Sequence, residues 1–169
     1  MDKPSKRLTI YVDGASRGNP GPAAIGVVIK DATGAALLRI GSSIGRKTNN
    51  QAEYSALITA LQEATKLGAD HVYINTDSQL MSEQVNGNYR VRNAHIRPLY
   101  EQAMQLLTAF QYYSIDHIPR SLNGEAGARA ARQVLRPVQP RLRQGHRLVH
   151  VVGGPPRPPR GPEPRGDRG

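Results

Sequence analysis

Apolar residues along the chain follow two periods, a two-residue alternation in some segments and a helical spacing in others, which predicts an α/β fold. Runs of apolar and β-branched residues bounded by turn residues predict five strands, at residues 8–14, 23–31, 35–45, 71–78 and 112–120. The clearest helix covers residues 48–68, with Gly68 as its C-cap. Further helices are predicted within residues 79–87, 93–110 and 123–135. The element order is therefore β-β-β-α-β-α-α-β-α.

The connections between these segments predict how the strands pair. Turn residues join the first three strands, which favours an antiparallel meander. The fourth strand directly follows the long helix, and this order indicates a right-handed crossover with parallel pairing. We expect one α/β domain over residues 1–136, with helices flanking a five-stranded mixed sheet.

The last part of the chain differs in composition from the rest. Residues 136–169 contain eight of the 13 prolines, eight arginines and only two acidic residues, a net +6 of the chain's +10. No hydrophobic period persists there. We expect residues 137–169 to form a basic, Pro/Gly/Arg-rich and disordered tail. A basic balance suits a polyanionic partner but does not by itself prove one.

The composition also excludes some classes of protein. The chain has no cysteine, which excludes disulfides and thiolate metal sites. No apolar run is long enough to span a bilayer, and the N-terminal residues do not resemble a signal peptide. We therefore expect a cytoplasmic protein without a membrane partner, and a monomer.

Three acidic residues stand where their side chains can converge. Asp13 ends the first strand, Glu53 lies in the first turns of the long helix, and Asp77 ends the fourth strand. Converging carboxylates repel one another and need a proton or a hard cation between them. An oxygen-only ligand set favours Mg²⁺ or Mn²⁺, and two such ions serve in-line phosphodiester hydrolysis. The alternative for each acid alone is a solvated or helix-capping role.

The residues around these acids resemble a known family. The segments "YVDGASRGNPGPAAIG" (11–26), "TNNQAEYSAL" (48–57) and "NTDSQL" (75–80) are similar to the leading motifs of type 1 ribonuclease H. The segments "NGNYRVRN" (86–93) and "HIPRSLNGEA" (117–126) are similar to the compact prokaryotic members without a basic protrusion. The resemblance covers about residues 7 to 135 in the family's order.

This resemblance implies both a fold and an activity. The fold is a ribonuclease H-like, five-stranded mixed sheet whose strands 1–3 are antiparallel. The activity is hydrolysis of the RNA strand of RNA/DNA hybrids to 5′-phosphate and 3′-hydroxyl ends. Asp13, Glu53 and Asp77 are then the catalytic, metal-binding acids for two Mg²⁺ or Mn²⁺ ions, with Asp13 as the shared ligand.

The resemblance also implies a substrate surface formed by small polar residues. These candidates are Ser16, Asn19, Thr48, Asn49, Asn50 and Gln79. By resemblance, the Asn and Gln side chains touch bases and ribose 2′-hydroxyls in the minor groove, and the 2′-hydroxyl distinguishes RNA from DNA. Thr48 with Asn19 resembles a pocket for a DNA-strand phosphate. Turn and N-cap roles are the alternative for these residues.

One position departs from the family pattern. Members usually carry a fourth carboxylate early in the last helix, and "NGEAGARAA" places Gly127 there. Glu125 is the nearest acid, but it replaces that ligand only if the helix start is irregular. Otherwise the enzyme works with three carboxylates and is weakened, or the chain binds hybrids without cutting them. A sequence lesion next to an unselected tail is the remaining alternative.

Other polar residues carry weaker signals. His117 lies inside a predicted strand, where we expect a structural role, and the i,i+4 pair His146 and His150 in the tail is attributed to chance. The segment "YRVRNAHIR" (89–97) is either a basic patch along the DNA backbone or a solvated loop. A DNA-acting enzyme on the same fold is a further rival, although the "GNPG" and "TNNQAE" surface favours a reader of ribose.

Overall fold

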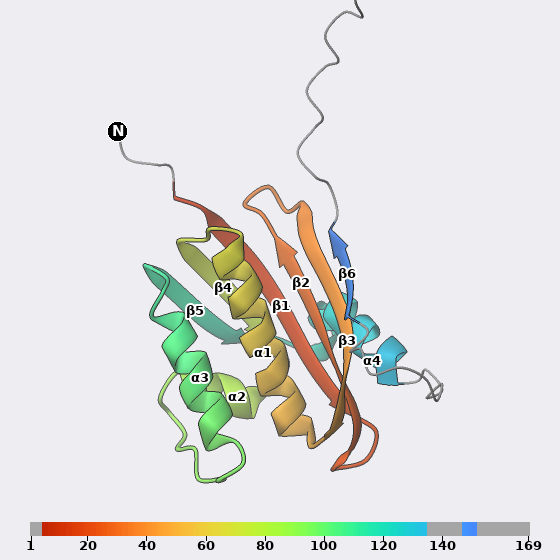
Figure 1. Ribbon diagram of the computed structural model, residues 1–169. Helices are drawn as coiled ribbons and strands as arrows, with labels where there is room; N and C mark the ends of the chain where they lie inside the picture. The colour runs from red at the N-terminus through yellow and green to blue at the C-terminus, as the bar shows by residue number, and fades with distance from the viewer. Residues whose placement is uncertain (1–4, 135–146, 152–169) are drawn as a thin grey trace, which may run out of the picture.

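The computed structural model of the chain describes residues 5–134 and 147–151 (Figure 1). The strands are β1 (Arg7–Ser16), β2 (Gly21–Lys30), β3 (Ala36–Lys47), β4 (His71–Thr76), β5 (Tyr112–His117) and β6 (Arg147–Val151). The helices are α1 (Asn49–Lys66), α2 (Gln79–Val85), α3 (Arg97–Leu107) and α4 (Gly124–Val134), with a 3-10 turn, η1 (Arg120–Asn123), before α4. None of these helices has the length and apolar character to cross a membrane.

The strands form one mixed sheet in the order β5-β4-β1-β2-β3-β6. β1, β2 and β3 pair antiparallel, while β1–β4 and β4–β5 pair parallel. The predicted meander, the parallel pairing of the fourth strand and the order of the first five strands along the chain are therefore confirmed. The α/β fold class is confirmed with them.

The sixth strand corrects one prediction. Residues 137–169 were expected to be disordered, yet Arg147–Val151 pairs antiparallel with β3 from Leu38↔Val151 to Ser42↔Arg147. Without β6, β3 would be an edge strand with a row of unpaired backbone groups, and a short segment rich in Leu and Val suits that edge. Residues 135–146 and 152–169 lie outside the described residues, so the prediction there stays a prediction.

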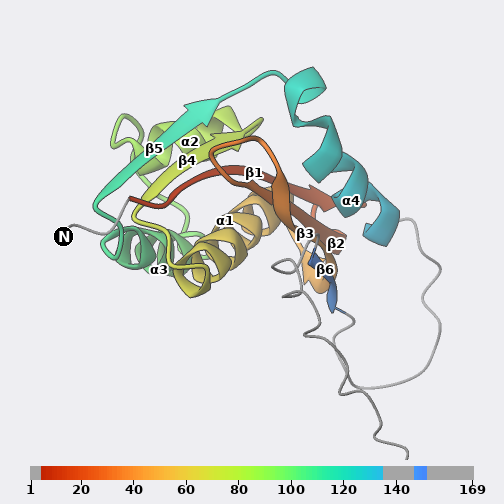
Figure 2. The ribbon, with the colours of Figure 1, turned by 90° about the horizontal axis from the view of Figure 1, so that it is seen from above.

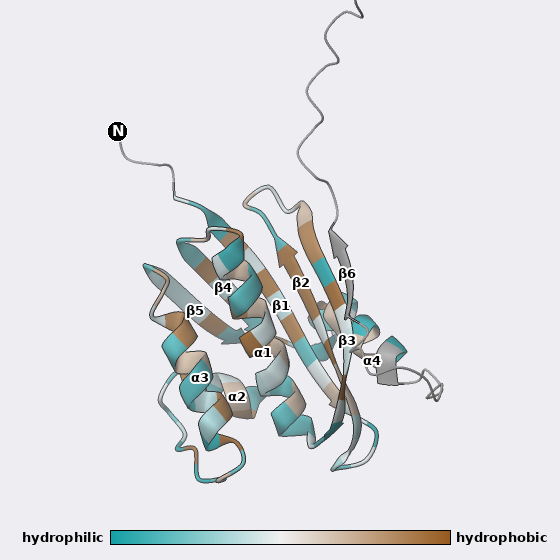
Figure 3. Ribbon diagram, viewed as in Figure 1, coloured by the Kyte–Doolittle hydropathy of each residue, from teal (hydrophilic) through white to brown (hydrophobic). Residues whose placement is uncertain are grey.

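Helices lie on both faces of the sheet (Figure 2). One face carries α1 and α3, and the other carries α4, which packs against β1, β2 and β3. Figure 3 shows the apolar residues concentrated on the strands, with polar residues toward the outer surface of the helices. The α1 face holds most of the core, because alternate residues of β1, Leu8, Ile10 and Val12, are fully buried there.

Element boundaries shift by a few residues from those the sequence predicts. The fifth strand ends at His117 instead of residue 120, since Pro119 has no N–H to continue the ladder. The third helix begins at Arg97 instead of residue 93, with Pro98 in its first turn. The last helix enters through η1, whose buried Asn123 donates from Nδ2 to the Val12 carbonyl at 2.8 Å. This bond ties the entry of α4 to β1.

The contact between α4 and the sheet needs a glycine at position 26. A Cβ on Gly26 would overlap the Ala126 carbonyl group and lie 3.0 Å from the Ala130 nitrogen. The helix backbone therefore rests directly on β2. Both Ala126 and Ala130 are fully buried, which completes a contact made of small residues.

We expect Gly26→Ala to destabilise the domain by about 1–3 kcal/mol, because overpacking forces the backbone of α4 away from β2. Gly124→Ala is the matched control, since nothing lies within 4 Å of the added Cβ. Urea unfolding followed by circular dichroism measures both. Equal stability of the two variants would contradict this close packing.

Candidate active site

Three carboxylates meet at one edge of the sheet. Asp13 lies in the C-terminal half of β1, Glu53 in the first turns of α1, and Asp77 directly after β4. One carboxylate oxygen from each lies within 4.8 Å of the others. The convergence expected from the sequence is confirmed, while the catalytic role of these acids stays a prediction.

Glycine at position 14 makes this convergence possible. A Cβ on Gly14 would overlap the backbone of Ala52 and Glu53, so only glycine lets the start of α1 approach β1 this closely. At this approach the Gly14 N–H donates to Glu53 Oε2 at 3.2 Å. This bond holds the Glu53 carboxylate, which comes from the α1 face of the sheet, close to Asp13. The Asp13 side chain lies on the opposite face, toward α4.

A capping box fixes where α1 begins. Thr48 is the N-cap, its Oγ1 accepts from the Gln51 N–H at 3.2 Å, and Gln51 Oε1 accepts from the Thr48 N–H at 2.9 Å. These bonds satisfy two backbone donors at the helix start. The N-cap role considered for Thr48 is thus confirmed, and the register of Glu53 relative to β1 follows from it.

Burial and mutual repulsion change the acidity of the cluster. Burial, then the charge of Asp77 and a hydrogen bond with it, raises the pKa of Asp13 to about 7. Burial, then the charges of Asp13 and Asp77, raises the pKa of Glu53 to about 9. Near neutral pH the cluster therefore retains protons that a cation can displace.

Arg120 is a site residue that the sequence analysis missed. Its Nε lies 3.5 Å from Asp77 Oδ2, and its positive charge lowers the pKa of Asp13 and Glu53 in opposition to burial. The Arg120 side chain is 95% exposed, whereas that of Asp77 is 9% exposed. Arg120 begins η1, shortly after β5, and the parallel pairing of β5 with β4 brings the end of β5 close to Asp77.

The donor set fits a hard divalent cation. The three ligands are all carboxylates, without His or Cys, as Mg²⁺ and Mn²⁺ prefer. Burial and the neighbouring carboxylates raise the pKa of Asp13 and Glu53, and the long, exposed Arg120 side chain offsets only part of this effect. Asp13, Glu53 and Asp77 would hold the ion.

Gly127 faces this cluster from α4. Its missing Cβ would lie 3.1 Å from Asp13 Oδ2, so a side chain at this position points at the carboxylates. Glu125 does not compensate, because Arg39 Nε donates to its Oε1 at 2.5 Å and Lys30 Nζ lies 4.0 Å from its Oε2. The idea that Glu125 supplies the fourth carboxylate is therefore wrong in this structure.

The predicted substrate residues form a connected polar ridge next to the carboxylates. Asn49 Oδ1 accepts from the Ser16 N–H at 2.9 Å, and Asn19 Oδ1 accepts from the Asn49 N–H at 3.1 Å. Ser16 Oγ also donates to the Lys47 carbonyl at 2.8 Å. The structure thus brings together Ser16 at the end of β1, Asn19 in the loop between β1 and β2, and Asn49 at the start of α1.

The other predicted residues lie close along the chain but bond differently. Asn50 has a buried side-chain oxygen with no hydrogen-bond partner among the described residues. Gln79 is the first residue of α2, directly after the N-cap Ser78, and is exposed. Gln79 is therefore accessible from solvent, whereas the Asn50 side-chain oxygen is not.

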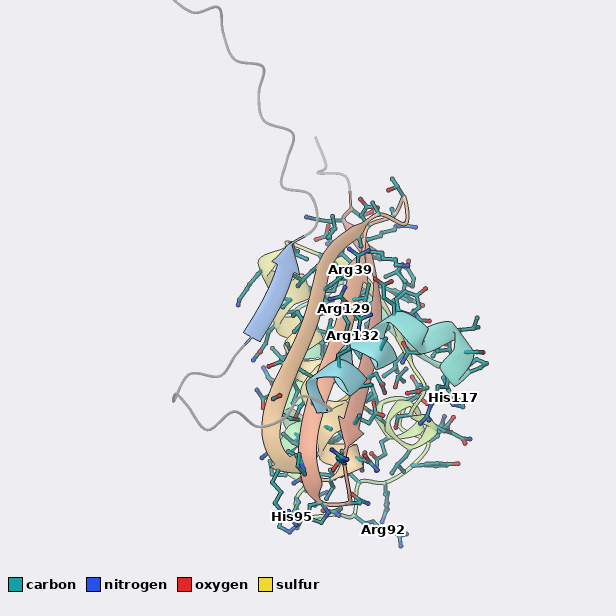
Figure 4. All side chains as sticks on the ribbon, turned by 90° about the vertical axis from the view of Figure 1, so that its right-hand side faces the viewer. Arg39, Arg92, His95, His117, Arg129 and Arg132 are labelled. Atoms are coloured by element: carbon teal, nitrogen blue, oxygen red, sulfur yellow. The ribbon has the colours of Figure 1, made fainter. Side chains whose placement is uncertain are left out.

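The residues with weaker signals lie in different parts of the fold. His117 is exposed at the end of β5, where its backbone pairs with Thr76, so the expected structural role is not one of core packing. Arg92 and His95 project from the connection between α2 and α3 (Figure 4). Of the pair in the tail, His146 lies outside the described residues, and the backbone of His150 pairs with Arg39.

Comparisons with known proteins agree with this geometry. The family model described as "Reverse transcriptase-like" matches residues 11–133. The structure is similar to that of RNase H1 from Halobacterium salinarum, with a TM-score of 0.74 and 44% identity over 76% of this chain and 97% of that one. The chain belongs to the type 1 ribonuclease H family.

Two further ribonuclease H relatives extend the comparison. The curated ribonuclease HI of Halobacterium salinarum is 46% identical over 124 residues, 73% of this chain and 62% of that protein. The chain thus spans less than two thirds of the length of this relative. A solved structure of LC11-RNase H1 in complex with RNA/DNA hybrid has a TM-score of 0.70 and 36% identity, covering 74% of this chain and 94% of that one.

The raised pKa values predict how pH affects stability. A carboxyl whose pKa is raised on folding contributes stability below its ordinary pKa and loses it as pH rises through the folded value. For Asp13 and Glu53 that loss runs from their ordinary pKa values of 3.8 and 4.5 up to about pH 9. We therefore expect the metal-free protein to lose stability over this range, and Mn²⁺ to stabilise it increasingly as pH rises.

Thermal unfolding in EDTA and in Mn²⁺, at pH 5 to 9, measures both effects. Glu53→Gln is the control, because it removes the group with the higher pKa and should flatten the pH dependence of the metal-free protein. If the variant and the unmodified protein share one pH profile, the carboxylates do not carry the titration.

Proposed function

We propose that the protein is a divalent-metal-dependent endonuclease that hydrolyses the RNA strand of RNA/DNA hybrids and leaves 5′-phosphate and 3′-hydroxyl ends. One observation carries the proposal: Asp13, Glu53 and Asp77 place carboxylate oxygens within 4.8 Å of one another. The polar ridge of Ser16, Asn19 and Asn49 beside them supports it. The similarity to LC11-RNase H1, solved with a hybrid, supports the choice of substrate.

The residues of the site have different roles in the proposed reaction. Asp13, Glu53 and Asp77 would hold the cations, and the Gly14 N–H orients the Glu53 carboxylate. Two divalent ions, when bound, stabilise the attacking and leaving oxygens of an in-line displacement. Arg120 adds a positive charge at the rim, next to Asp77, where a phosphate approaches.

The polar ridge accounts for recognition without sequence preference. Small amide and hydroxyl groups can hydrogen-bond sugar edges and 2′-hydroxyls, which all RNA sequences share. Gln79, exposed at the start of α2, and Asn50, next to Asn49 in α1, are further candidates for these contacts. The Thr48 hydroxyl accepts the N-cap hydrogen bond of α1, so this residue is held in a fixed position. A DNA-strand phosphate bound beside Thr48 would contact its backbone and side chain.

Gly127 supports a second candidate function, a hybrid-binding module with weakened or no catalysis. The position points at Asp13, and no acidic side chain among the described residues takes the place of the missing carboxylate. The ridge alone would then bind the hybrid. We favour the enzyme, because the three remaining carboxylates converge, and the repulsion that raises the pKa of Asp13 and Glu53 is relieved by a divalent cation.

Cleavage of a labelled RNA/DNA hybrid in Mg²⁺ and in Mn²⁺ tests the proposal. We expect slow cleavage by the unmodified protein and loss of at least about 100-fold in Asp13→Asn, because that variant removes the shared ligand. Hybrid binding without cleavage, in both the unmodified protein and Gly127→Asp, would reject the enzyme and leave the binding module.

The Gly127 position has its own expected effect on metal affinity. We expect Gly127→Asp to tighten Mn²⁺ binding by about tenfold, since it adds a carboxylate beside Asp13. Gly127→Asn is the matched control, because it adds the same bulk at 3.1 Å from Asp13 Oδ2 without the charge. Isothermal titration calorimetry measures both variants; equal affinities would show that position 127 does not reach the ion.

A further inference from the structure

Half of one sheet face is not covered by a helix in the described part of the chain. On the α4 side, α4 packs against β1, β2 and β3 and leaves β4 and β5 uncovered (Figure 2). Strand pairing places Tyr73 beside Thr9, and Tyr112 beside His71. Because side chains alternate between faces, Tyr11, Tyr73, His71 and Tyr112 share the face of Asp13. We call these four residues the open tyrosine face.

The rings on this face contact one another but are not part of the core. The ring centroids of Tyr73 and Tyr112 lie 5.7 Å apart, and those of His71 and Tyr112 lie 6.0 Å apart. Tyr112 is 48% exposed. The buried Nδ1 of His71 has no hydrogen-bond partner among the described residues. An aromatic surface of this kind offers planar rings on which a flat ligand can stack.

Positive charges border the open tyrosine face on the α4 side. Lys30 Nζ lies 5.4 Å from the centre of the Tyr11 ring, and Arg39, Arg129 and Arg132 follow over α4 and β3 (Figure 4). Together these four residues form the basic strip. The pKa of Glu125 is lowered by the hydrogen bond from Arg39 and then by the positive charges of Arg39, Lys30 and Arg129. These three cations therefore surround a single carboxylate. The basic strip therefore keeps an excess of positive charge.

We propose that the open tyrosine face and the basic strip together bind single-stranded nucleic acid. Stacking rings beside a row of cations are the two components that such binding requires. The bases would stack on Tyr112 and Tyr73, and the phosphates would contact Lys30 and the arginines. Tyr11 is two residues from Asp13 on the same face, so the strand leads to the carboxylates. In this respect the inference rests on the proposed function.

The proposal assigns the surface to the unpaired extension of a hybrid. A hybrid whose strand continues beyond the duplex would hold the duplex on the polar ridge and the extension on the open tyrosine face. We therefore expect an extension to strengthen binding of a hybrid, and Tyr112→Ala to remove that gain. Binding of a blunt hybrid should not change in this variant.

Fluorescence anisotropy with labelled 12-nucleotide oligo(U) and oligo(dT) tests the surface directly. The full chain is used in EDTA, where metal-dependent cleavage cannot occur. We expect Tyr112→Ala to weaken binding of one or both oligonucleotides by about tenfold, and the comparison of the two shows whether the surface prefers RNA or DNA. Tyr112→Phe should retain binding within about twofold, because it keeps the ring.

Lys66→Ala is the control, since Lys66 is 67% exposed and ends α1, on the other face of the sheet. If Tyr112→Ala binds like the unmodified protein, or Lys66→Ala loses as much, the proposal is overturned. Loss in Tyr112→Ala alone supports it. A protein that binds oligonucleotides through Tyr112 but neither binds nor cleaves blunt hybrid would instead contradict the proposed function.

Discussion

The close approach of α1 to β1 at Gly14 is the constraint on which the site depends. At this point the helix backbone occupies the space that any side chain at position 14 would need, and the Gly14 N–H donates to Glu53. The capping box of Thr48 and Gln51 sets the helix start that this approach requires. The contact between α1 and β1 therefore has two effects: it packs the helix against the sheet, and it brings together three carboxylates that repel one another.

A second close approach, of α4 to β2 at Gly26, positions α4 on the opposite face of the sheet. It brings Gly127 over Asp13 and directs Glu125 toward Lys30 and Arg39 instead of toward the carboxylates. The scaffold for a fourth ligand is therefore intact, although the ligand is absent. In the enzyme proposed above, a side chain at position 127 would therefore reach the carboxylates that hold the metal.

Much of the fold and of the acidic cluster could be predicted from sequence, because strand alternation, the cap at Thr48 and the strand-end positions of Asp13 and Asp77 are local signals. Three features could not be predicted. Arg120 depends on the parallel pairing of β4 with β5, and the ion pairs of Glu125 depend on how α4 crosses the sheet. The pairing of β6 with β3 depends on an edge left open by the rest of the fold. Each is a long-range contact without a local pattern.

The central claim is that three carboxylates suffice to hold divalent cations without a fourth ligand at position 127. Anomalous diffraction from crystals of the protein soaked in Mn²⁺ near pH 8 tests it most directly. The account predicts a Mn²⁺ peak between the side chains of Asp13, Glu53 and Asp77, with Arg120 displaced from Asp77. A structure at the same Mn²⁺ concentration with no peak at this cluster, and with Arg120 still on Asp77, would contradict it.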